Sequence, residues 1–184
     1  AKIDRKKAKT INLGLFYGMG KGKLSSELGL SPGEAEDLFE KYHKRVPFVK
    51  EMIERTMKQA ADIGHVRTLL GRKCRFDKWE PSRYGVHRPL PRDEAEREHG
   101  KQIRRAFTYK ALNKLIQGSA ADMTKQAMAD LHDEGIIPHI QVHDELDCSF
   151  EDEVEKDKIL EIMRNAGKLE VPVKLDAELG PTGG

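Results

Sequence analysis

Glycine and proline divide the first part of this 184-residue chain into segments that favour short helices. Ser31, Pro32 and Glu34 form a helix start, with serine as the N-cap, proline at the first position and glutamate closing a capping box. Pro47 interrupts the helix that follows, and a second amphipathic pattern begins beside it at Phe48. The pattern predicts a mainly helical first part.

The first predicted helix carries an unusual face. Arg5, Lys9, Leu13 and Tyr17 recur every four residues, so they form one stripe of two cations, an apolar residue and an aromatic ring. Positive charge suits phosphates, and a flat apolar surface suits a base and its sugar. Gly14 removes a side chain beside the stripe, so a base or another backbone can approach. The stripe suits a nucleoside triphosphate, although cations at this spacing more often form a solvated face.

The middle of the chain predicts less regular structure followed by helix. Residues 19–30 read as a loop followed by a short apolar pattern, and residues 77–92 read as irregular because they are rich in proline and charge. A long helical region follows over residues 93–131. We expect it to break near Gly100 and again near Gly118.

The last part of the chain predicts strands. Residues 135–150 read as strand, tight turn and strand, and residues 171–177 alternate between apolar and polar side chains, which predicts a terminal strand. The predicted fold class is therefore α+β, with a helical lobe followed by a lobe that contains a small antiparallel sheet.

The composition indicates that any binding of nucleic acid would depend on local clusters of basic residues. The chain is 35% charged with a net charge of only +2, so its overall charge does not indicate a nucleic-acid partner. Cys74 and Cys148 form no CxxC pair, which favours a reduced, intracellular chain, and no apolar run approaches membrane-spanning length, so we expect no membrane partner. Basic residues nevertheless gather at four places: residues 5–9, 21–23, 67–75 and 101–105.

A charged triplet lies between two alternating runs near the carboxyl end. A hairpin over this region would place His143, Asp144 and Glu145 at its tip, although a tip with these residues is commonly a solvated turn. His139 and Cys148 lie close enough in sequence to suggest a zinc site with His143. The ligand count and spacing are poor for zinc, so the zinc interpretation is disfavoured.

Three sequence runs resemble family A DNA polymerases, the bacterial polymerase I and phage polymerase group. The Arg5-x3-Lys9-x7-Tyr17-Gly18 pattern is similar to the family's fingers helix, QVHDE at residues 141–145 to its palm carboxylate motif, and LNKLIQGSAAD at residues 112–122 to the helix that enters the palm. The TLLGR run at residues 68–72 resembles a family loop more weakly. The resemblance implies a fingers-like helical lobe over residues 1–108 and a distal palm-like lobe over residues 109–184.

The resemblance also implies roles in nucleotide binding. Arg5 and Lys9 would hold the phosphates of the incoming dNTP, and Lys9 would also give a proton to the leaving pyrophosphate. Tyr17 would stack near the templating position beside Gly14. Leu13 departs from the family, which most often has Phe or Tyr against the sugar, so the resemblance leaves sugar selectivity open.

For the palm, the resemblance implies a two-metal Mg²⁺ site. The aspartate that matches Asp144 ligates the catalytic metals in that family, Glu145 would be a weaker or outer ligand, and His143 would contact the primer end. Metal ions roughly 3.5–4 Å apart accelerate such phosphoryl transfer, and Mg²⁺ prefers carboxylate oxygens.

Contacts with primer–template DNA follow from the same resemblance. Asn113 and Gln117 are four residues apart on a predicted helix, so both amides can meet the minor-groove edges that all correct base pairs share. Without the resemblance, two exposed or capping amides would be the simpler interpretation. Arg72, in the TLLGR run, would touch the template backbone.

One expected part of such a polymerase has no match here. The family's other catalytic aspartate lies in a strand motif like Asp-Tyr-Ser-x-Ile-Glu upstream of the fingers helix, and nothing in these 184 residues matches it or the thumb. We interpret the chain, which begins at Ala1, as a piece of a longer protein or one half of a split polymerase. We expect it to be inactive alone, to need a companion chain with the upstream palm and thumb, and to act in the cytoplasm of a bacterium or a phage-infected host.

Two other functions remain open from the sequence. Single-subunit RNA polymerases share the Arg…Lys…Tyr-Gly helix, but their palm motif looks like His-Asp-Ser, so Glu145 favours DNA synthesis. Alternatively, the chain is a non-catalytic nucleic-acid-binding fragment whose basic helix only grips phosphate. Such binding would be salt-sensitive and indifferent to nucleotide.

Overall fold

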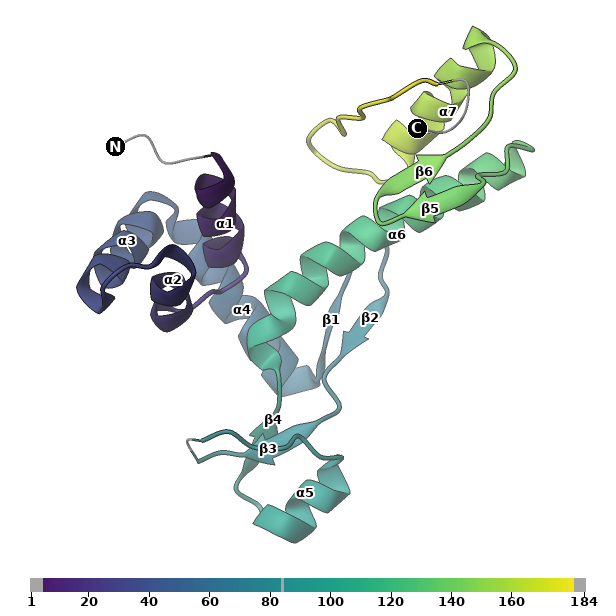
Figure 1. Ribbon diagram of the computed structural model, residues 1–184. Helices are drawn as coiled ribbons and strands as arrows, with labels where there is room; N and C mark the ends of the chain where they lie inside the picture. The colour runs from purple at the N-terminus through teal and green to yellow at the C-terminus, as the bar shows by residue number, and fades with distance from the viewer. Residues whose placement is uncertain (1–4, 84, 181–184) are drawn as a thin grey trace. The chain divides into compact units, whose positions relative to one another are not determined.

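The computed structural model describes residues 5–83 and 85–180, with seven α-helices, a short 3₁₀ helix and three two-stranded sheets among them (Figure 1). The predicted α+β fold class is confirmed. The chain divides into two compact units. Unit 1 comprises residues 1–66 and 73–115, and unit 2 comprises residues 67–72 and 116–184.

The first three helices of unit 1 surround one small core. They are α1 (Arg5–Phe16), α2 (Lys21–Leu28) and α3 (Pro32–Arg45). Ile11, Leu15 and Leu24 are buried together, and side chains of α3 such as Phe39 pack against them. The prediction of a loop over residues 19–30 was wrong in its centre, because burial of Leu24 fixes a short helix that its weak apolar pattern does not indicate.

The predicted cap and proline break are both present. The Ser31 hydroxyl accepts a hydrogen bond from the Glu34 N–H, and the Glu34 carboxylate accepts one from the Ser31 N–H. Helix α4 (Pro47–Ile63) begins at the proline. Proline is favoured at this position because the first N–H groups of a helix have no hydrogen-bond acceptor within the helix, so the N–H that proline lacks is not needed. It ends at Gly64, which adopts the left-handed conformation with φ of 75°.

A second core joins α4 to the strands that follow. Strands β1 (His65–Arg67) and β2 (Lys73–Arg75) pair with each other. Ala60, Val66, Phe76 and Ala111 are buried in one cluster. The paired strands form a short hairpin directly after Gly64, and this cluster packs it against α4.

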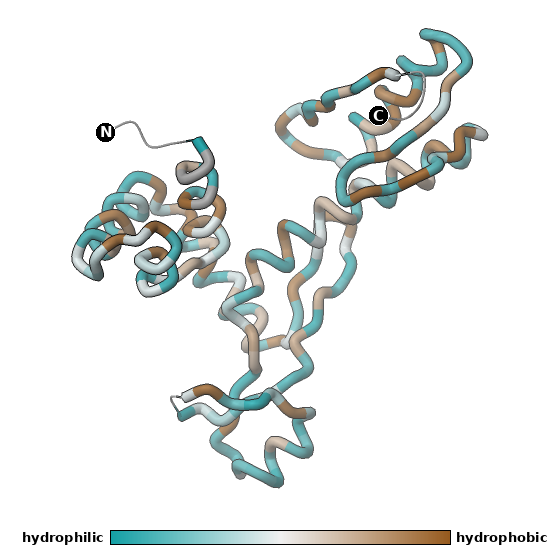
Figure 2. Tube along the Cα trace, in the orientation of Figure 1, coloured by the Kyte–Doolittle hydropathy of each residue, from teal (hydrophilic) through white to brown (hydrophobic). Residues whose placement is uncertain are grey.

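Residues 77–92, predicted to be irregular, contain a strand that pairs far along the chain. Strand β3 (Trp79–Pro81) pairs antiparallel with β4 (Ile103–Arg105), and α5 (Arg92–His99) lies between them in sequence. Trp79 is flanked by the guanidinium groups of Arg92 and Arg105, whose Cζ atoms lie 5.1 and 4.6 Å from its ring centroid. Helix α5 is almost wholly hydrophilic in Figure 2.

A short 3₁₀ helix, η1 (Thr108–Lys110), leads into the longest helix, α6 (Ala111–Asp133). The predicted break near Gly100 is confirmed, because α5 ends there. The predicted break near Gly118 is wrong: α6 runs through it without interruption. A single glycine costs a helix interior only about 1 kcal/mol relative to alanine, which the surrounding turns can offset.

Unit 2 contains a hairpin and a helix around a third core. Strands β5 (Ile140–Val142) and β6 (Glu145–Asp147) pair antiparallel, and α7 (Glu153–Asn165) follows. Leu131, Ile136 and Ile159 are buried together, with Leu146 against them. The terminal strand predicted over residues 171–177 is wrong. Those residues form no strand in the structure, because an alternating pattern becomes a strand only when a neighbour supplies hydrogen bonds.

Candidate functional site

The predicted nucleotide-binding stripe lies on the exposed side of α1. Arg5 and Lys9 are exposed, and Leu13 is 44% exposed. On the other side of the helix, Ile11 and Leu15 are buried in the core, as the sequence pattern predicts. The helix is therefore anchored from behind, and Arg5 and Lys9 are exposed to solvent on its other side.

The carboxyl end of α1 is closed by backbone hydrogen bonds, from the Gly18 N–H to the Leu15 oxygen and from the Met19 N–H to the Gly14 oxygen. Gly18 has a φ of 84°, and a Cβ atom placed on it would lie 3.9 Å from the carbonyl oxygen of Tyr109 in η1. The Tyr17 ring packs edge-on against Phe16, with 5.8 Å between centroids. Gly14, predicted to leave room for a base, is covered by the flexible side chain of Met19. A ligand that approaches Gly14 must displace that side chain.

The two amides predicted to meet the minor groove lie on α6. Asn113 and Gln117 are both exposed and are separated by one helical turn. The neighbouring residues Ala111 and Leu112 are fully buried and fix the start of the helix. The exposed amides are thus carried by an anchored helix.

In unit 2, the predicted carboxylates occupy a tight hairpin. Val142 pairs with Glu145, so His143 and Asp144 form a two-residue turn. His143 adopts the left-handed conformation with φ of 55°, and the Gln141 side-chain N–H₂ donates to its carbonyl oxygen at 2.6 Å. His143 and Asp144 are exposed at the tip, and Glu145 is the exposed first residue of β6.

The chemistry of these carboxylates fits part of a magnesium site. Asp144 and Glu145 offer hard oxygen donors, which Mg²⁺ prefers. Across residues 5–83 and 85–180, however, no three His, Cys, Asp or Glu side chains come together as a metal-binding group. A site for two Mg²⁺ ions therefore needs further oxygen ligands besides these two.

The groups considered for zinc have other surroundings. His139 Nε2 lies 2.9 Å from the hydroxyl of Ser149. Burial, together with the negative charge of Asp147, raises the pKa of the Cys148 thiol. A raised pKa favours the neutral thiol, whereas zinc binds the thiolate.

The sequence did not reveal the buried carboxylate beside Arg72. Asp122 on α6 has a side chain that is 7% exposed, and its Oδ1 accepts a hydrogen bond from Arg72 Nε at 2.7 Å. Arg72 also donates to the carbonyl oxygen of Gly118 at 3.0 Å, and the Leu69 N–H donates to the Ser119 hydroxyl at 2.9 Å. The loop of residues 68–72 is thus tied to one turn of α6.

Opposing effects act on the pKa of Asp122. Burial alone would raise the pKa, but hydrogen bonds from Thr68 and Arg72 and the positive charges of Arg72 and Lys125 lower it below its ordinary range. Asp122 is therefore ionised at neutral pH. The sequence shows Asp122 in the QGSAAD run, but it does not show the ion pair, because Arg72 lies fifty residues earlier in the chain.

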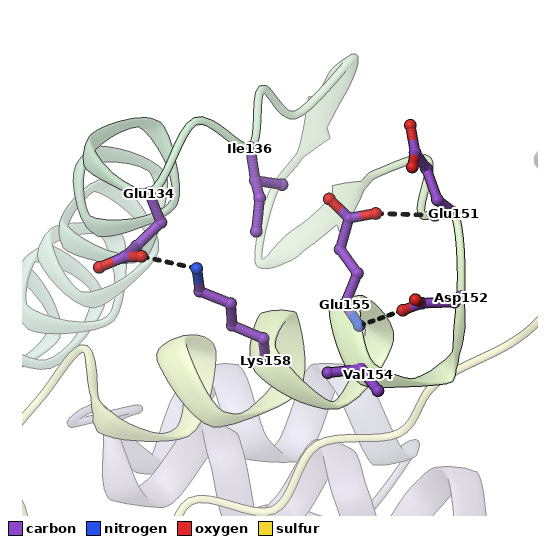
Figure 3. A pocket seen from close by; sticks show the side chains of 7 residues that line it. All are labelled: Glu134, Ile136, Glu151, Asp152, Val154, Glu155 and Lys158. Atoms are coloured by element: carbon purple, nitrogen blue, oxygen red, sulfur yellow. Dashed lines mark hydrogen bonds and ion pairs between the residues drawn. The ribbon is translucent and has the colours of Figure 1, made fainter.

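A separate pocket of about 270 Å³ lies between the end of α6 and α7 (Figure 3). Three of its four carboxylates, those of Glu134, Asp152 and Glu155, are engaged locally. Lys158 pairs with Glu134 at 2.6 Å, Asp152 caps α7 by accepting from the Glu155 N–H, and Glu155 accepts from the Glu151 N–H. None of the predicted site residues lines this pocket.

The comparisons with known proteins agree with one another. Residues 1–183 match the family model described as DNA polymerase family A. A DNA-directed DNA polymerase of Pseudomonas phage M6 is 34% identical and matches 100% of this chain but 30% of its own length. The thermostable DNA polymerase I of Thermus filiformis is 38% identical over 96% of this chain and 20% of its own length.

A solved structure is similar as well. The POL domain of Pol1 from M. smegmatis, in complex with DNA primer–template and dNTP, matches with a TM-score of 0.70 and 31% identity, over 92% of this chain and 29% of that one. The chain thus spans less than a third of the length of these relatives. No helix among residues 5–83 and 85–180 is both long and apolar enough to cross a bilayer.

Proposed function

Because the chain belongs to DNA polymerase family A, we propose that it contributes the fingers and distal palm of a polymerase that extends a primer on a DNA template. The observation that carries the proposal is the stripe of α1, in which exposed Arg5, Lys9 and Leu13 lie opposite buried Ile11 and Leu15. An anchored helix with outward cations suits a triphosphate.

In this proposal α1 binds the incoming dNTP. Arg5 and Lys9 pair with its phosphates, and the Lys9 ammonium donates a proton to the leaving pyrophosphate oxygen. Leu13 lies against the sugar, and Tyr17 stacks near the templating base beside Gly14. The solved relative whose structure contains dNTP supports a nucleotide partner.

DNA contacts come from both units. Asn113 and Gln117 meet the minor-groove edges of the newest base pairs, where amides can donate or accept. Arg72 lies near the template backbone, in a loop whose geometry Asp122 fixes. His143 contacts the primer end. The solved relative is bound to a DNA primer–template, which supports DNA as the substrate.

Asp144 and Glu145 would hold Mg²⁺ at the hairpin tip. Bound Mg²⁺ would activate the attacking 3′-oxygen and stabilise the leaving one. Because these two side chains are not joined by a third ligand among the described residues, the proposed two-metal site needs another carboxylate. We assign it to a companion chain that carries the upstream palm and thumb.

Two exposed features of unit 2 support a companion. Ile140 and Val142 are 56% and 52% exposed on the hairpin, and they share a face with Glu145 and Asp147 by register. The alternating residues 171–177 lack a strand partner. A companion that supplies another strand would cover both features. The bacterial and phage relatives support a bacterial cytoplasm or an infected host as the proposed location.

Primer extension with Mg²⁺ tests the proposal. The chain alone should extend nothing, and the chain mixed with a polypeptide that carries the upstream palm and thumb should extend the primer. Extension by the purified chain alone would contradict the need for a companion. Stable association and duplex binding without extension in the mixture would indicate a nucleic-acid-binding fragment instead.

A further inference from the structure

Residues 79–105 form a small module of unit 1 that the proposed function leaves without a role. Strands β3 and β4 pair with each other, and Leu90 pairs with Trp79 through backbone hydrogen bonds of 2.7 and 2.9 Å. Pro81, Leu90 and Ala95 are buried, and Trp79 packs between two guanidinium groups. The module is therefore a folded support for the loop of residues 82–89, which follows β3.

The loop of residues 82–89 is held closed by its own contacts. The Ser82 N–H donates to the carbonyl oxygen of Gln102 at 2.9 Å, which joins the loop to the turn before β4. His87 Nε2 lies 3.2 Å from the carbonyl oxygen of Arg83. Gly85 has φ of 143°, and a Cβ atom on it would lie 3.0 Å from His87 Nε2. A loop that is already closed loses little conformational entropy when it binds a ligand.

Most arginines of the module have partners within the protein. Three of them form ion pairs with carboxylates of the same module, namely Arg92–Glu96 at 2.9 Å, Arg97–Asp93 at 3.5 Å and Arg104–Glu80 at 3.0 Å. Arg105 donates to the carbonyl oxygens of Ala61 and Phe76 and lies over the Trp79 ring. These four charges are thus used to hold the module together.

Three cations of the module are different. Arg83, Arg88 and Lys101 are exposed, and none of them belongs to an ion pair in the described part of the chain. Arg83 and Lys101 flank the hydrogen bond between Ser82 and Gln102, so the loop and the turn present these charges at one end of the strand pair. Residues 82–89 contain no Asp or Glu. We call these three residues the cationic end of the module.

The chemistry of the cationic end fits the backbone of double-stranded DNA. Arginine binds phosphate with two parallel hydrogen bonds, and the charge of an unpaired cation is available to an anion. Duplex DNA carries a negative charge for roughly every 1.7 Å of its axis. Each phosphate contact with it adds about 0.9 to the salt slope, compared with about 0.7 for a single strand. Several separated cations therefore gain most from a duplex.

The cationic end lies away from the groups assigned to the newest base pairs. Strand β4 begins beside the cationic end and leads from its other end through η1 into α6, which carries Asn113 and Gln117. A strand of three residues spans about 10 Å. The cationic end and the two amides thus lie beyond opposite ends of β4, and they face different stretches of DNA.

We propose that Arg83, Arg88 and Lys101 bind the phosphate backbone of the duplex ahead of the primer end, where the template is still paired with a strand that synthesis has to displace. Phosphate contacts fix the position of this duplex without reading its sequence. The inference rests on the proposed function, which supplies the template. It adds a second DNA-binding surface that is separate from α1, α6 and the hairpin of unit 2.

The test uses the assembled polymerase, meaning this chain with the polypeptide that carries the upstream palm and thumb. Two fluorescent DNAs share one primer duplex and one template: the first has a single-stranded template overhang, and the second has a further strand annealed to the overhang beyond a short gap. For the gapped DNA, Arg83→Gln/Arg88→Gln should lower the slope of log K against log salt by about 1.8, the value for two duplex phosphates. A fourfold rise in salt would then weaken the variant about twelvefold less than the wild type.

The overhang DNA and a charge-matched variant are the controls. Arg83→Gln/Arg88→Gln should leave the slope for the overhang DNA unchanged, and Lys101→Gln should lower the slope for the gapped DNA by about 0.9. Lys44→Gln/Arg45→Gln removes two exposed cations at the end of α3 that also form no ion pair among the described residues. It should change neither slope, and all variants should keep the wild-type melting temperature.

Three results would overturn the proposal. Equal changes on both DNAs would mean that the cations touch the primer duplex, and a change as large for Lys44→Gln/Arg45→Gln would mean that only net charge matters. Unchanged slopes would mean that the cationic end meets another partner, such as an acidic protein surface.

Single-nucleotide incorporation on the gapped DNA separates this inference from the proposed function. Absent incorporation by the wild type, with the slope change present, rejects the proposed function alone. Incorporation by the wild type without a slope change in the variants rejects the contact with the duplex ahead alone.

Discussion

The Nε atom of Arg72 lies 2.7 Å from Oδ1 of Asp122, which is fifty residues further along the chain and buried. This pair, with the hydrogen bond from Arg72 to Gly118, holds the loop of residues 68–72 against α6. It gives Arg72 a structural task beside its proposed contact with the template. The two tasks can be separated by experiment.

Replacing Arg72 with alanine should destabilise the fold by about 1–3 kcal/mol, because the buried Asp122 carboxylate would lose its charged donor. Arg97→Ala is the matched control, since Arg97 pairs with Asp93 on the surface of α5 at 3.5 Å; its effect should stay within about 0.5 kcal/mol. Urea unfolding measures both. Equal effects of the two variants would show that the Arg72 pair contributes no more than a surface pair.

Gly64→Ala should destabilise the protein for two separable reasons. Gly64 has φ of 75°, and a Cβ there would lie 2.6 Å from Cζ of Arg105. Gly29→Ala isolates the first reason, because Gly29 also has positive φ, at 64°, but has open space around it. We expect about 1–2 kcal/mol for Gly29→Ala and a larger loss for Gly64→Ala in the same denaturation experiment. A loss at Gly64 no larger than that at Gly29 would mean that Arg105 moves aside freely.

His43 should make stability depend on pH. Burial, with the nearby charge of Lys50, lowers its pKa below the ordinary value of 6.5, and its Nδ1 is buried without a hydrogen-bond partner in the described residues. The folded state therefore binds a proton less readily than the unfolded state, so stability is fully present above pH 6.5 and falls as the pH drops below it. His43→Phe should remove that part of the fall between pH 7.5 and 5.5 in urea unfolding. An unchanged pH profile would exclude His43 as its source.

Leu13→Phe should strengthen binding of a matched dNTP by about fivefold in the assembled polymerase, because a ring adds roughly 1 kcal/mol of apolar contact with the sugar. The side chain is 44% exposed, so the larger group has room. Leu169→Phe is the control, since Leu169 is also 44% exposed but lies outside the proposed site. Nucleotide titrations of single-turnover extension measure the change. A similar gain in both variants would not support a sugar contact at Leu13.

The sequence predicted the elements whose determinants are local. The capping box at Ser31 and the proline at residue 47 placed α3 and α4 correctly, since each acts on its own helix. Strands β3 and β4 were missed, because Trp79 pairs with Arg105 across α5. The terminal strand was expected from alternation alone, which cannot supply a partner.

The candidate site divides in the same way. Residues of α1 and of the hairpin could be nominated because their spacing and family resemblance lie within short runs. The position of Met19 over Gly14 and the burial of Asp122 beside Arg72 depend on how side chains pack, which short runs do not encode. The positive φ of Phe107, 62°, was hidden for the same reason, because aromatic residues do not indicate positive φ.

The central claim is that Asp144 takes part in nucleotidyl transfer. The most direct measurement is the single-turnover rate of Mg²⁺-dependent incorporation by the assembled polymerase, with Asp144→Asn compared with Asp147→Asn. Asp147 is an exposed carboxylate of the same hairpin, in register with Ile140 and away from the tip. We predict that Asp144→Asn reduces the rate by about a thousandfold or more, as for loss of a principal electrostatic contributor, while Asp147→Asn leaves it within about twofold. Equal rates for Asp144→Asn and the wild type, with DNA bound normally, would contradict the account.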